Sequence, residues 1–375
     1  MREINHVEVE YHGRKVGILA ENKSGLGAFE YDKEWLADGF SISPFSLPLE
    51  KRVFVPKTDH LEGLFGVFAD SLPDGWGRLL VDRMLKKEGV APSSISSVCR
   101  LGIVGRTGMG ALEYKPQLMR EEEYKDIDFD WLSLQCVKIW KEEDSEALDK
   151  LFFMGGSSGG ARPKAFFKKN GEGWMVKFPS GYDRTSIGEE EYRYMLCAKR
   201  CGIEIPEIQL FPSKQCKGFF GVRRFDRIGK EKVHMVSASG LLETSHRIPN
   251  LDYQDFMKLT YFLTRDEQQL MELFRRMCFN VFAHNRDDHS KNFSYLYHSV
   301  DKRWVLSPAY DLTYSHSIGG EHATSVYGNG KDPGAEELVS VGKAAGLSIR
   351  WMKKTIKEVE EIVFAELKDI LRSHQ

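Results

Sequence analysis

The segment FAHNRDDHSKNFSYL, residues 282–296, gathers two His, two adjacent Asp, two Asn, one Arg and one Lys between apolar flanks. Within it, Asp287 directly follows Arg286 and precedes Asn292 by five positions. One short loop with this spacing orients a carboxylate toward an attacking hydroxyl and an amide oxygen toward a metal ion. Three explanations compete: a polar surface loop, a metal-hydrolase centre, or the catalytic loop of a phosphoryl-transfer enzyme.

A second acidic residue follows at a useful distance. Asp311 lies 19 residues past Asn292, in LSPAYDLTYS, between the apolar WVL and Leu312. An aspartate that only faces solvent is rarely embedded in such a stretch. The two segments together favour phosphoryl transfer, with Asp311 as a further metal ligand.

Phosphate binding requires backbone N–H groups and a compensated cation. GGSSGGARPK (155–164) offers flexible backbone that can approach phosphate oxygens, but no G-K-[ST] follows, so it is not a Walker A loop. Lys177 lies in the apolar GWMVKF, where its charge needs a partner such as phosphate or a carboxylate of GEEEYRYM. The alternative reading is a simple turn and a lysine whose head reaches solvent.

Two other motifs predict less. GRTGMG (105–110) matches G-x-G-x-x-G only loosely and lacks a βαβ context, so we interpret it as a turn. A zinc-hydrolase centre could use His284, Asp287, Asp288 and His289. However, its two histidines lie five apart across a non-helical loop, and the sequence offers no further His/Cys ligand set at zinc-like spacing. The zinc hydrolase remains a minor alternative.

The elements that must position these residues follow from local patterns. The sequence predicts, in order, a hairpin over 4–20, an edge or loop segment at 40–50, a helix over 72–89, extended structure over 101–116, strand, glycine loop and two further strands over 151–178, a helix over 187–202 and a strand at 218–226. Beyond about residue 250 the pattern is helical, ending in an amphipathic helix over 348–373.

Bulk composition limits the possible classes. The 375 residues are 41% hydrophobic and 29% charged, which suits two or three globular domains. A net charge of −2 gives no general reason to expect nucleic-acid binding. The six cysteines form no CxxC pair, and no apolar run approaches the roughly 18 residues that span a bilayer. We therefore expect a protein of the reducing cytoplasm that does not enter membranes.

The chain resembles the HipA family, serine/threonine kinases that act as toxins in bacterial type II toxin–antitoxin modules. The resemblance rests on FSISPFSLPLE, GLFGVFADSLPDGWGRLLVDRML, LGIVGRTGMGAL, AHNRDDHSKNFS and PAYDLTYS. It implies an α+β, bilobal, protein-kinase-like fold with a β-rich N-terminal lobe and an all-helical C-terminal lobe. The implied parts are an N-terminal subdomain (1–120), a kinase N-lobe (121–225) and a helical C-lobe (226–375).

The resemblance also implies a role for each residue that matches a family motif. Asp287 is then the catalytic base, with His289 beside it in an Asp-x-His-x-x-Asn pattern, and Asn292 and Asp311 bind Mg²⁺. The implied nucleotide-binding residues are Ser158, Gly159, Gly160, Lys177, its partner Glu191, and the hinge residues Arg223 and Phe225. Ser157 aligns with a serine that family members autophosphorylate to switch themselves off, although the neighbouring Ser158 leaves that assignment ambiguous.

The implied function is transfer of the ATP γ-phosphoryl group to a Ser or Thr hydroxyl of a protein, for which family members use aminoacyl-tRNA synthetases. A HipB-like antitoxin would neutralise the chain and provide any contact with DNA. One alternative is a nucleotide-binding pseudokinase that acts through its complex with the antitoxin. Another is a lipid kinase, suggested by the Asp-x-His-x-x-Asn pattern but disfavoured because no basic membrane-binding cluster is present.

Overall fold

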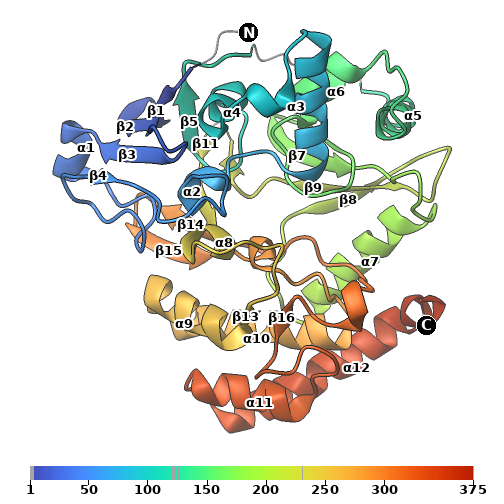
Figure 1. The fold of residues 1–375 in the computed structure, drawn as a ribbon. Coiled ribbons are helices and arrows are strands. Elements are labelled where there is room, and N and C mark those ends of the chain that lie inside the picture. The colour runs from blue at the N-terminus through green and yellow to red at the C-terminus, as the bar shows by residue number, and fades with distance from the viewer. Residues whose placement is uncertain (1–3, 120–123, 125–126, 230, 375) are drawn as a thin grey trace. The chain divides into compact units, whose positions relative to one another are not determined.

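The computed structural model of the chain describes residues 4–119, 124, 127–229 and 231–374. These residues form two compact units (Figure 1). The first unit comprises Met1–Thr185 and Phe211–Thr244, and the second comprises Ser186–Leu210 and Ser245–Gln375. The predicted boundary between residues 120 and 121 lies outside the described residues.

The first unit mixes strands and helices. Its elements are β1 (His6–Tyr11), β2 (Arg14–Glu21), β3 (Gly27–Tyr31), α1 (Lys33–Asp38), β4 (Val53–Phe54), α2 (Gly66–Ala69), α3 (Gly75–Lys87), η1 (Pro92–Ser94), α4 (Ser97–Val104), β5 (Leu112–Lys115), α5 (Phe129–Trp140), α6 (Leu148–Gly155), β6 (Lys164–Lys169), β7 (Glu172–Lys177), β9 (Phe219–Arg223), β10 (Arg227–Ile228), β11 (Glu231–Lys232), β12 (His234–Ser237) and α8 (Ala238–Leu241). The short β8 (Ile208–Phe211) spans the boundary between the units.

An antiparallel five-stranded sheet, in the order β4-β3-β2-β1-β5, begins the chain. The hairpin predicted over 4–20 is confirmed as β1 and β2. Its two turn residues, His12 and Gly13, both have positive φ (49° and 75°), as a tight two-residue hairpin requires. The predicted loop at 40–50 is likewise confirmed, with only an isolated bridge between Ser43 and Leu47.

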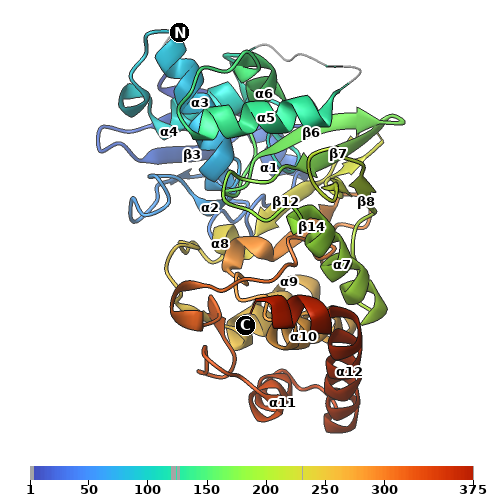
Figure 2. The same cartoon turned by 90° about the vertical axis from the view of Figure 1, so that its right-hand side faces the viewer.

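A second antiparallel arrangement, β6-β7-β9, carries the strand that ends at Lys177. α3 packs beside α6, and α6 packs on β6 (Figures 1 and 2). The buried core between these elements includes Trp76, Leu80, Leu151 and Trp174. The predicted helix over 72–89 is confirmed as α3.

Two local predictions in this unit are wrong. Residues 151–155 form the end of helix α6 instead of a strand, and residues 101–104 belong to helix α4 instead of an extended segment. Both stretches are short and apolar, and such a stretch suits a buried strand and a buried helix equally well. Their packing against neighbouring elements selects the helix.

The second unit is mainly helical. Its elements are α7 (Ile187–Arg200), β13 (Leu251–Asp252), α9 (Tyr253–Thr264), α10 (Glu267–Phe282), η2 (Ser290–Asn292), β14 (Ser294–His298), β15 (Arg303–Leu306), η3 (Ile318–Gly320), β16 (Thr324–Ser325), α11 (Ala335–Ala344) and α12 (Ile349–Ser373). α12 packs along α10, α7 and α11 (Figure 2). The expectation of an all-helical C-terminal lobe is wrong, because β14 and β15 form an antiparallel hairpin directly after the polar segment 283–292.

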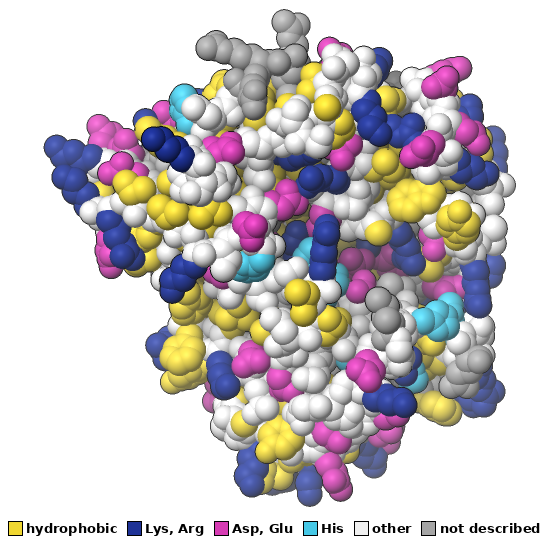
Figure 3. Space-filling view, in the orientation of Figure 1, with side chains coloured by type: hydrophobic (Ala, Val, Ile, Leu, Met, Phe, Trp, Pro, Cys, Tyr) yellow, Lys and Arg dark blue, Asp and Glu magenta, His cyan; other side chains and the backbone are white. Residues whose placement is uncertain are grey.

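The expected α+β class is confirmed. All six cysteines are free thiols, and Cys197 and Cys201 are buried side chains of the packed second unit. Basic and acidic side chains alternate over the face shown in Figure 3, in keeping with the small net charge. Among the helices in the described part of the chain, none is both long and apolar enough to cross a bilayer.

Candidate active site

Helix α10 delivers the polar segment, which leaves the helix at Ala283 and continues through His284 in the left-handed region (φ 52°). The Asp287 side chain is 60% exposed, and its Oδ1 lies 3.7 Å from Nε2 of His289. The side-chain amide of Asn292 donates from Nδ2 to the Asp287 carbonyl oxygen over 2.7 Å. The structure therefore brings together Asp287, His289 and Asn292, with the aspartate carboxylate accessible to a substrate.

The neighbouring Asp288 anchors this loop in the interior. Its carboxylate is fully buried and accepts hydrogen bonds from the hydroxyl of Tyr253 (2.7 Å) and the backbone N–H of Thr324 (3.2 Å). Nδ1 of His322 lies 3.0 Å from the same carboxylate, and the Thr324 hydroxyl donates to the Asp288 carbonyl oxygen. A buried carboxylate with this many partners holds the backbone on either side of it.

The same network extends to the end of α10. The Asn280 amide donates to the Tyr253 hydroxyl over 2.9 Å, and the Asn285 amide donates to Asn280 Oδ1 over 2.9 Å. Burial raises the pKa of Tyr253 well above its ordinary value, so the phenol keeps its proton and serves as a donor. From the sequence, Asp288 was considered only as a ligand in the zinc alternative, and its role as an anchor was not predicted. Its position directly after Asp287 could have indicated that the two adjacent carboxylates face opposite ways, one to solvent and one to the core.

Asp311 follows β15 on an irregular segment and has a left-handed backbone (φ 56°), a conformation that Asp and Asn tolerate better than most residues. The preceding Tyr310 connects this segment to the polar segment 283–292. Its hydroxyl donates to the Lys291 carbonyl oxygen over 2.6 Å and lies 2.6 Å from the Ser294 hydroxyl. The residue before Asp311 is thus bonded to the residue before Asn292.

The two expected metal ligands suit a hard cation such as Mg²⁺, which prefers oxygen donors. The Asn292 amide uses its nitrogen to bond the Asp287 carbonyl, which leaves its oxygen as the atom for a cation. Asp311 adds a partly exposed carboxylate. The donor set is therefore chemically appropriate for Mg²⁺.

The same geometry weighs against the zinc-hydrolase alternative. Asp288, one of its four candidate ligands, is occupied by Tyr253, His322 and Thr324. The ring of His284 is stacked on Tyr314, with ring centroids 6.3 Å apart and an interplanar angle of 12°.

The glycine-rich loop lies in the first unit, between α6 and β6. Ser157 is 8% exposed and donates from its hydroxyl to the Thr107 carbonyl oxygen over 2.9 Å. Ser158 is fully buried and donates to the Gly155 carbonyl oxygen over 2.6 Å. Gly159 and Gly160 are exposed. The loop thus presents its glycine backbone to solvent while both serine side chains face inward.

Lys177 ends strand β7 and is buried, with its Nζ 5.7 Å from the centroid of the Phe220 ring. Its direct cross-strand partner is Lys164, a second buried lysine at the start of β6. Two like charges facing each other across a strand pair destabilise a sheet unless anions or acceptors compensate them. Lys164 donates to the Gly159 carbonyl oxygen. Lys164 was not predicted as a site residue, although it lies at the end of the GGSSGGARPK segment. The expected partner Glu191 is a buried residue of α7 in the second unit.

The expected hinge residues lie at the end of β9 and just after it. Arg223 is the last residue of that strand and lies 3.9 Å from Glu172, and Phe225 is half-buried. Between and after them, Arg224 and Arg227 both contact the buried carboxylate of Asp226, at 2.7 Å each. Burial alone would raise the pKa of Asp226, but the two guanidinium groups outweigh it and hold that pKa well below its usual range.

These arginines also hold the GRTGMG segment, which the structure confirms as a loop between α4 and β5. Both donate to the Gly108 carbonyl oxygen, and the Gly110 N–H donates to Asp226 over 2.9 Å. The loop that receives the Ser157 hydroxyl is therefore bonded to the hinge segment.

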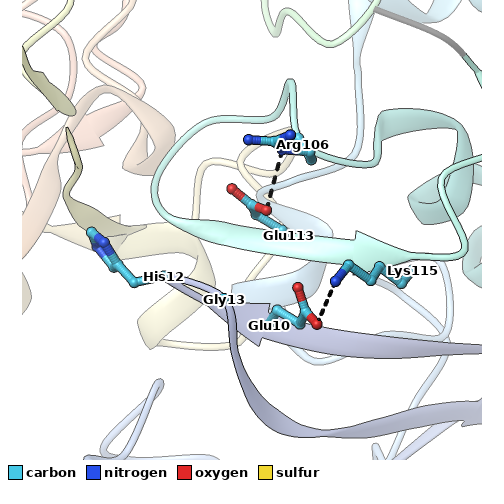
Figure 4. Close-up of a pocket in the computed structure, with 6 residues that line it drawn as sticks. All are labelled: Glu10, His12, Gly13, Arg106, Glu113 and Lys115. Atoms are coloured by element: carbon cyan, nitrogen blue, oxygen red, sulfur yellow. Dashed lines mark hydrogen bonds and ion pairs between the residues drawn. The ribbon is translucent and has the colours of Figure 1, made fainter. Parts of the chain in front are cut away.

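A charged pocket of about 440 Å³ lies beside that loop (Figure 4). Its ion pairs join Arg106 to Glu113 over 3.4 Å and Lys115 to Glu10 over 2.7 Å. Because the lining charges compensate one another, the pocket supports the loop and contains none of the residues expected to carry chemistry.

Family comparisons cover most of the chain. The model of the HipA N-terminal domain matches residues 7–115, and that of the HipA-like C-terminal domain matches residues 156–366. A relative from Sinorhizobium fredii (strain NBRC 101917 / NGR234), named "Putative kinase Y4dM", is 28% identical over 96% of this chain and 91% of its own length. A Haemophilus influenzae (strain ATCC 51907 / DSM 11121 / KW20 / Rd) relative named "Putative kinase" is 26% identical over 39% of this chain and 47% of its own.

A solved structure has the same fold. It is the complex of HipA, HipB and operator DNA from the toxin–antitoxin system of Shewanella oneidensis MR-1. The match has a TM-score of 0.71 and 18% sequence identity, and it covers 97% of this chain and 90% of that one. The kinase-like fold expected from the sequence is thus confirmed.

Proposed function

The chain belongs to the HipA family, and on that premise we propose that it is a kinase that transfers the ATP γ-phosphoryl group to a Ser or Thr hydroxyl of a protein. The observation that carries the proposal is the catalytic loop: an exposed Asp287 carboxylate, with the backbone that follows it fixed by Asn292 and by buried Asp288. We propose that the chain has three parts: an N-terminal subdomain over residues 1–120, a kinase N-lobe over 121–225 and a C-lobe over 226–375.

Asp287 acts on the acceptor. Its carboxylate orients the attacking hydroxyl and accepts its proton as the new O–P bond forms and the bond from the γ-phosphorus to the oxygen of the leaving ADP breaks. His289, 3.7 Å away, lies where it can hold the carboxylate in place. The Asp287 carboxylate must be accessible, because a protein substrate has to bring its hydroxyl side chain to it.

Asn292 and Asp311 are the residues that would hold Mg²⁺, through one amide and one carboxylate oxygen. When bound, the ions supply charge stabilisation for the phosphate oxygens during in-line transfer. The Tyr310 bond to Lys291 keeps the two ligand segments in register.

We also propose which residues bind the nucleotide. We assign the phosphates to the glycine-rich loop at Ser158, Gly159 and Gly160 and to the ammonium of Lys177, with Glu191 as the lysine's partner. Arg223 and Phe225 would border the adenine. Support for Lys177 comes from its position: it is a buried lysine at the end of β7, the strand that pairs with β6 directly after the glycine-rich loop.

We propose Ser157 as the site of self-inhibition by autophosphorylation. Its hydroxyl is buried and donates to the Thr107 carbonyl oxygen. The loop must therefore break this bond and move outward before Ser157 can reach a γ-phosphate. Ser158 is buried more deeply still.

The proposed partners follow from the family and from the S. oneidensis complex, which contains HipB and operator DNA. We propose a HipB-like antitoxin as the neutralising partner and as the only route to DNA. An aminoacyl-tRNA synthetase is the proposed class of protein substrate, and the cytoplasm the proposed compartment.

The test is intact mass after incubation with ATP and Mg²⁺, alongside ATP binding by calorimetry. Wild type should gain one phosphate on Ser157, and Asp287→Ala should gain none while binding ATP as before, with turnover lowered by several orders of magnitude. Asp301→Ala serves as the matched control, since that carboxylate is exposed on the β14–β15 turn and pairs only weakly with Arg303 at 3.5 Å.

Each outcome discriminates. Equal phosphorylation in Asp287→Ala would remove Asp287 from the catalytic role. ATP binding without any phosphate gain on the chain or on a synthetase panel would favour the pseudokinase. No ATP binding by wild type would exclude the kinase.

A further inference from the structure

One peptide group of the glycine-rich loop is held at both of its polar ends by charged side chains. The carboxylate of Asp74 accepts the Gly160 N–H, and the ammonium of Lys164 donates to the Gly159 carbonyl oxygen. These two groups belong to the same Gly159–Gly160 peptide bond. The orientation of that peptide plane is therefore specified by a pair of opposite charges that come from two different elements.

The turn that begins α3 holds the next group of the loop. The backbone N–H of Trp76 donates to the Gly160 carbonyl oxygen over 2.9 Å, and its indole N–H donates to the Lys164 carbonyl oxygen over 3.1 Å. A Cβ on Gly75 would lie 2.4 Å from the Gly160 oxygen, and one on Gly77 would lie 2.2 Å from the Ser158 oxygen. Only glycine at these positions permits the two backbones to approach so closely.

The inner side of the loop is held as well. Ser157 donates to the Thr107 carbonyl, and the Arg224–Asp226–Arg227 cluster fixes the segment that follows Thr107. Every polar group of the loop named here is thus bonded to the unit that carries it, although Gly159 and Gly160 themselves are exposed.

We propose that Asp74 and Lys164 are positioning residues that hold the glycine-rich loop in the conformation that binds the nucleotide phosphates. The inference rests on the proposed kinase function and adds to it two residues that do not themselves need to touch the nucleotide. A loop rich in glycine has the largest conformational entropy to lose on ordering. Fixing it before ATP arrives removes that loss from the binding step.

The opposing effect is electrostatic repulsion between the Asp74 carboxylate and phosphate. The ammonium of Lys164 reaches the same two glycines, since a Cβ on Gly160 would lie 2.7 Å from Lys164 Nζ and one on Gly159 would lie 3.1 Å from Asp74 Oδ1. The pair adds no net charge at the loop, so preorganisation outweighs repulsion.

The experiment compares ATP KM and kcat for Asp74→Ala, Asp74→Asn and Lys164→Met in the full chain. Asp74→Ala and Lys164→Met should each raise the KM for ATP by about tenfold or more, the effect of one charge-assisted hydrogen bond, with kcat changed much less. Asp74→Asn keeps an oxygen acceptor for the Gly160 N–H and should restore most of the affinity. A merely structural role would lower activity without this split or this rescue.

Lys87→Ala is the matched control. Lys87 lies on the same helix and pairs with Asp149 of α6 over 2.7 Å, with both side chains about half exposed, so it weakens the α3–α6 contact away from the loop. It should leave the KM for ATP unchanged. Gly77→Ala is an independent probe, because alanine favours the helix but pushes against the Ser158 carbonyl, and it should also raise KM.

Hydrogen exchange of residues 156–163 without nucleotide separates this proposal from the proposed function. Faster exchange in Asp74→Ala than in wild type and Asp74→Asn is expected even for a chain that never turns over ATP. Unchanged exchange and KM in Asp74→Ala would overturn the positioning role, as would a lower KM, which would mean that the carboxylate competes with phosphate. If wild type fails to bind ATP while the exchange difference is present, the kinase function fails and the structural restraint stands.

Discussion

The hydroxyl of Tyr310 donates a 2.6 Å hydrogen bond to the carbonyl oxygen of Lys291. Tyr310 immediately precedes Asp311, and Lys291 immediately precedes Asn292. One side chain therefore sets the spacing between the two segments from which we propose that Mg²⁺ is bound.

Tyr310→Phe should weaken Mg²⁺ binding while leaving the fold intact. The phenol oxygen is lost but the ring is retained, so the two ligand segments are no longer bonded to each other. We expect the Mg²⁺ concentration for half-maximal activity to rise several-fold, the effect of about 1 kcal/mol. A magnesium titration of turnover measures this. Tyr182→Phe, at a residue 90% exposed, is the control, and an unchanged titration in Tyr310→Phe would contradict the prediction.

Asp311 combines an expected metal ligand with a left-handed backbone (φ 56°). Asp311→Asn should keep the thermal stability of the chain, because Asn tolerates this conformation, yet lose activity at ordinary Mg²⁺ concentrations. Asp311→Ala should lose activity and in addition lower the free energy of unfolding by about 1 kcal/mol, because alanine is strained there. Thermal unfolding of the two variants side by side separates the charge from the backbone, and equal melting temperatures would refute the strain argument.

Tyr253→Phe tests the buried network beneath the catalytic loop. The substitution leaves the Asp288 carboxylate with one donor fewer and the Asn280 amide without its acceptor. An unsatisfied buried polar group costs about 1–3 kcal/mol, so unfolding should begin at lower urea and kcat should fall. Tyr261→Phe on the same helix is 49% exposed and should behave as wild type. If both variants unfold alike, the network does not anchor the loop.

His234 predicts how stability depends on pH. It is fully buried, and burial lowers its pKa to about 4, although its contact with the Ile42 carbonyl oxygen opposes the shift. Between about pH 6.5 and pH 4, His234 is therefore protonated in the unfolded chain but stays neutral in the folded chain. This group's contribution is complete above pH 6.5 and falls as pH drops toward 4, by on the order of 3 kcal/mol in all.

Urea unfolding at pH 5 and pH 7.5 measures that dependence. The difference in free energy of unfolding should be smaller in His234→Leu than in wild type, because leucine takes up no proton. If wild type and His234→Leu show the same pH dependence of the free energy of unfolding, that dependence comes from other groups.

The residue spacing within a single loop was predictable from the sequence. Asp287, His289 and Asn292 lie within one six-residue segment, and so short a segment keeps these residues near one another in space. The hairpin of β1 and β2 and the helix α3 were predictable for the same reason, since turn chemistry and periodicity act over a few residues. The order of the motifs along the chain followed from these local patterns, and the α+β class was implied by the family resemblance.

The short apolar stretches at 101–104 and 151–155 were not decided by their own residues. Each is too short for its period to be read, and each became helical through packing against neighbours distant in sequence.

Contacts between distant residues were settled only by the tertiary structure. Asp288 is buried because His322 and Thr324, 34 and 36 residues later, return to it. Asp74 reaches Gly160 across 86 residues, and Tyr310 reaches Lys291 across 19. No local pattern encodes such pairs, because each depends on how whole elements pack. The sequence thus determined which groups are available for chemistry, and the packing of the elements decided which of them are held in place.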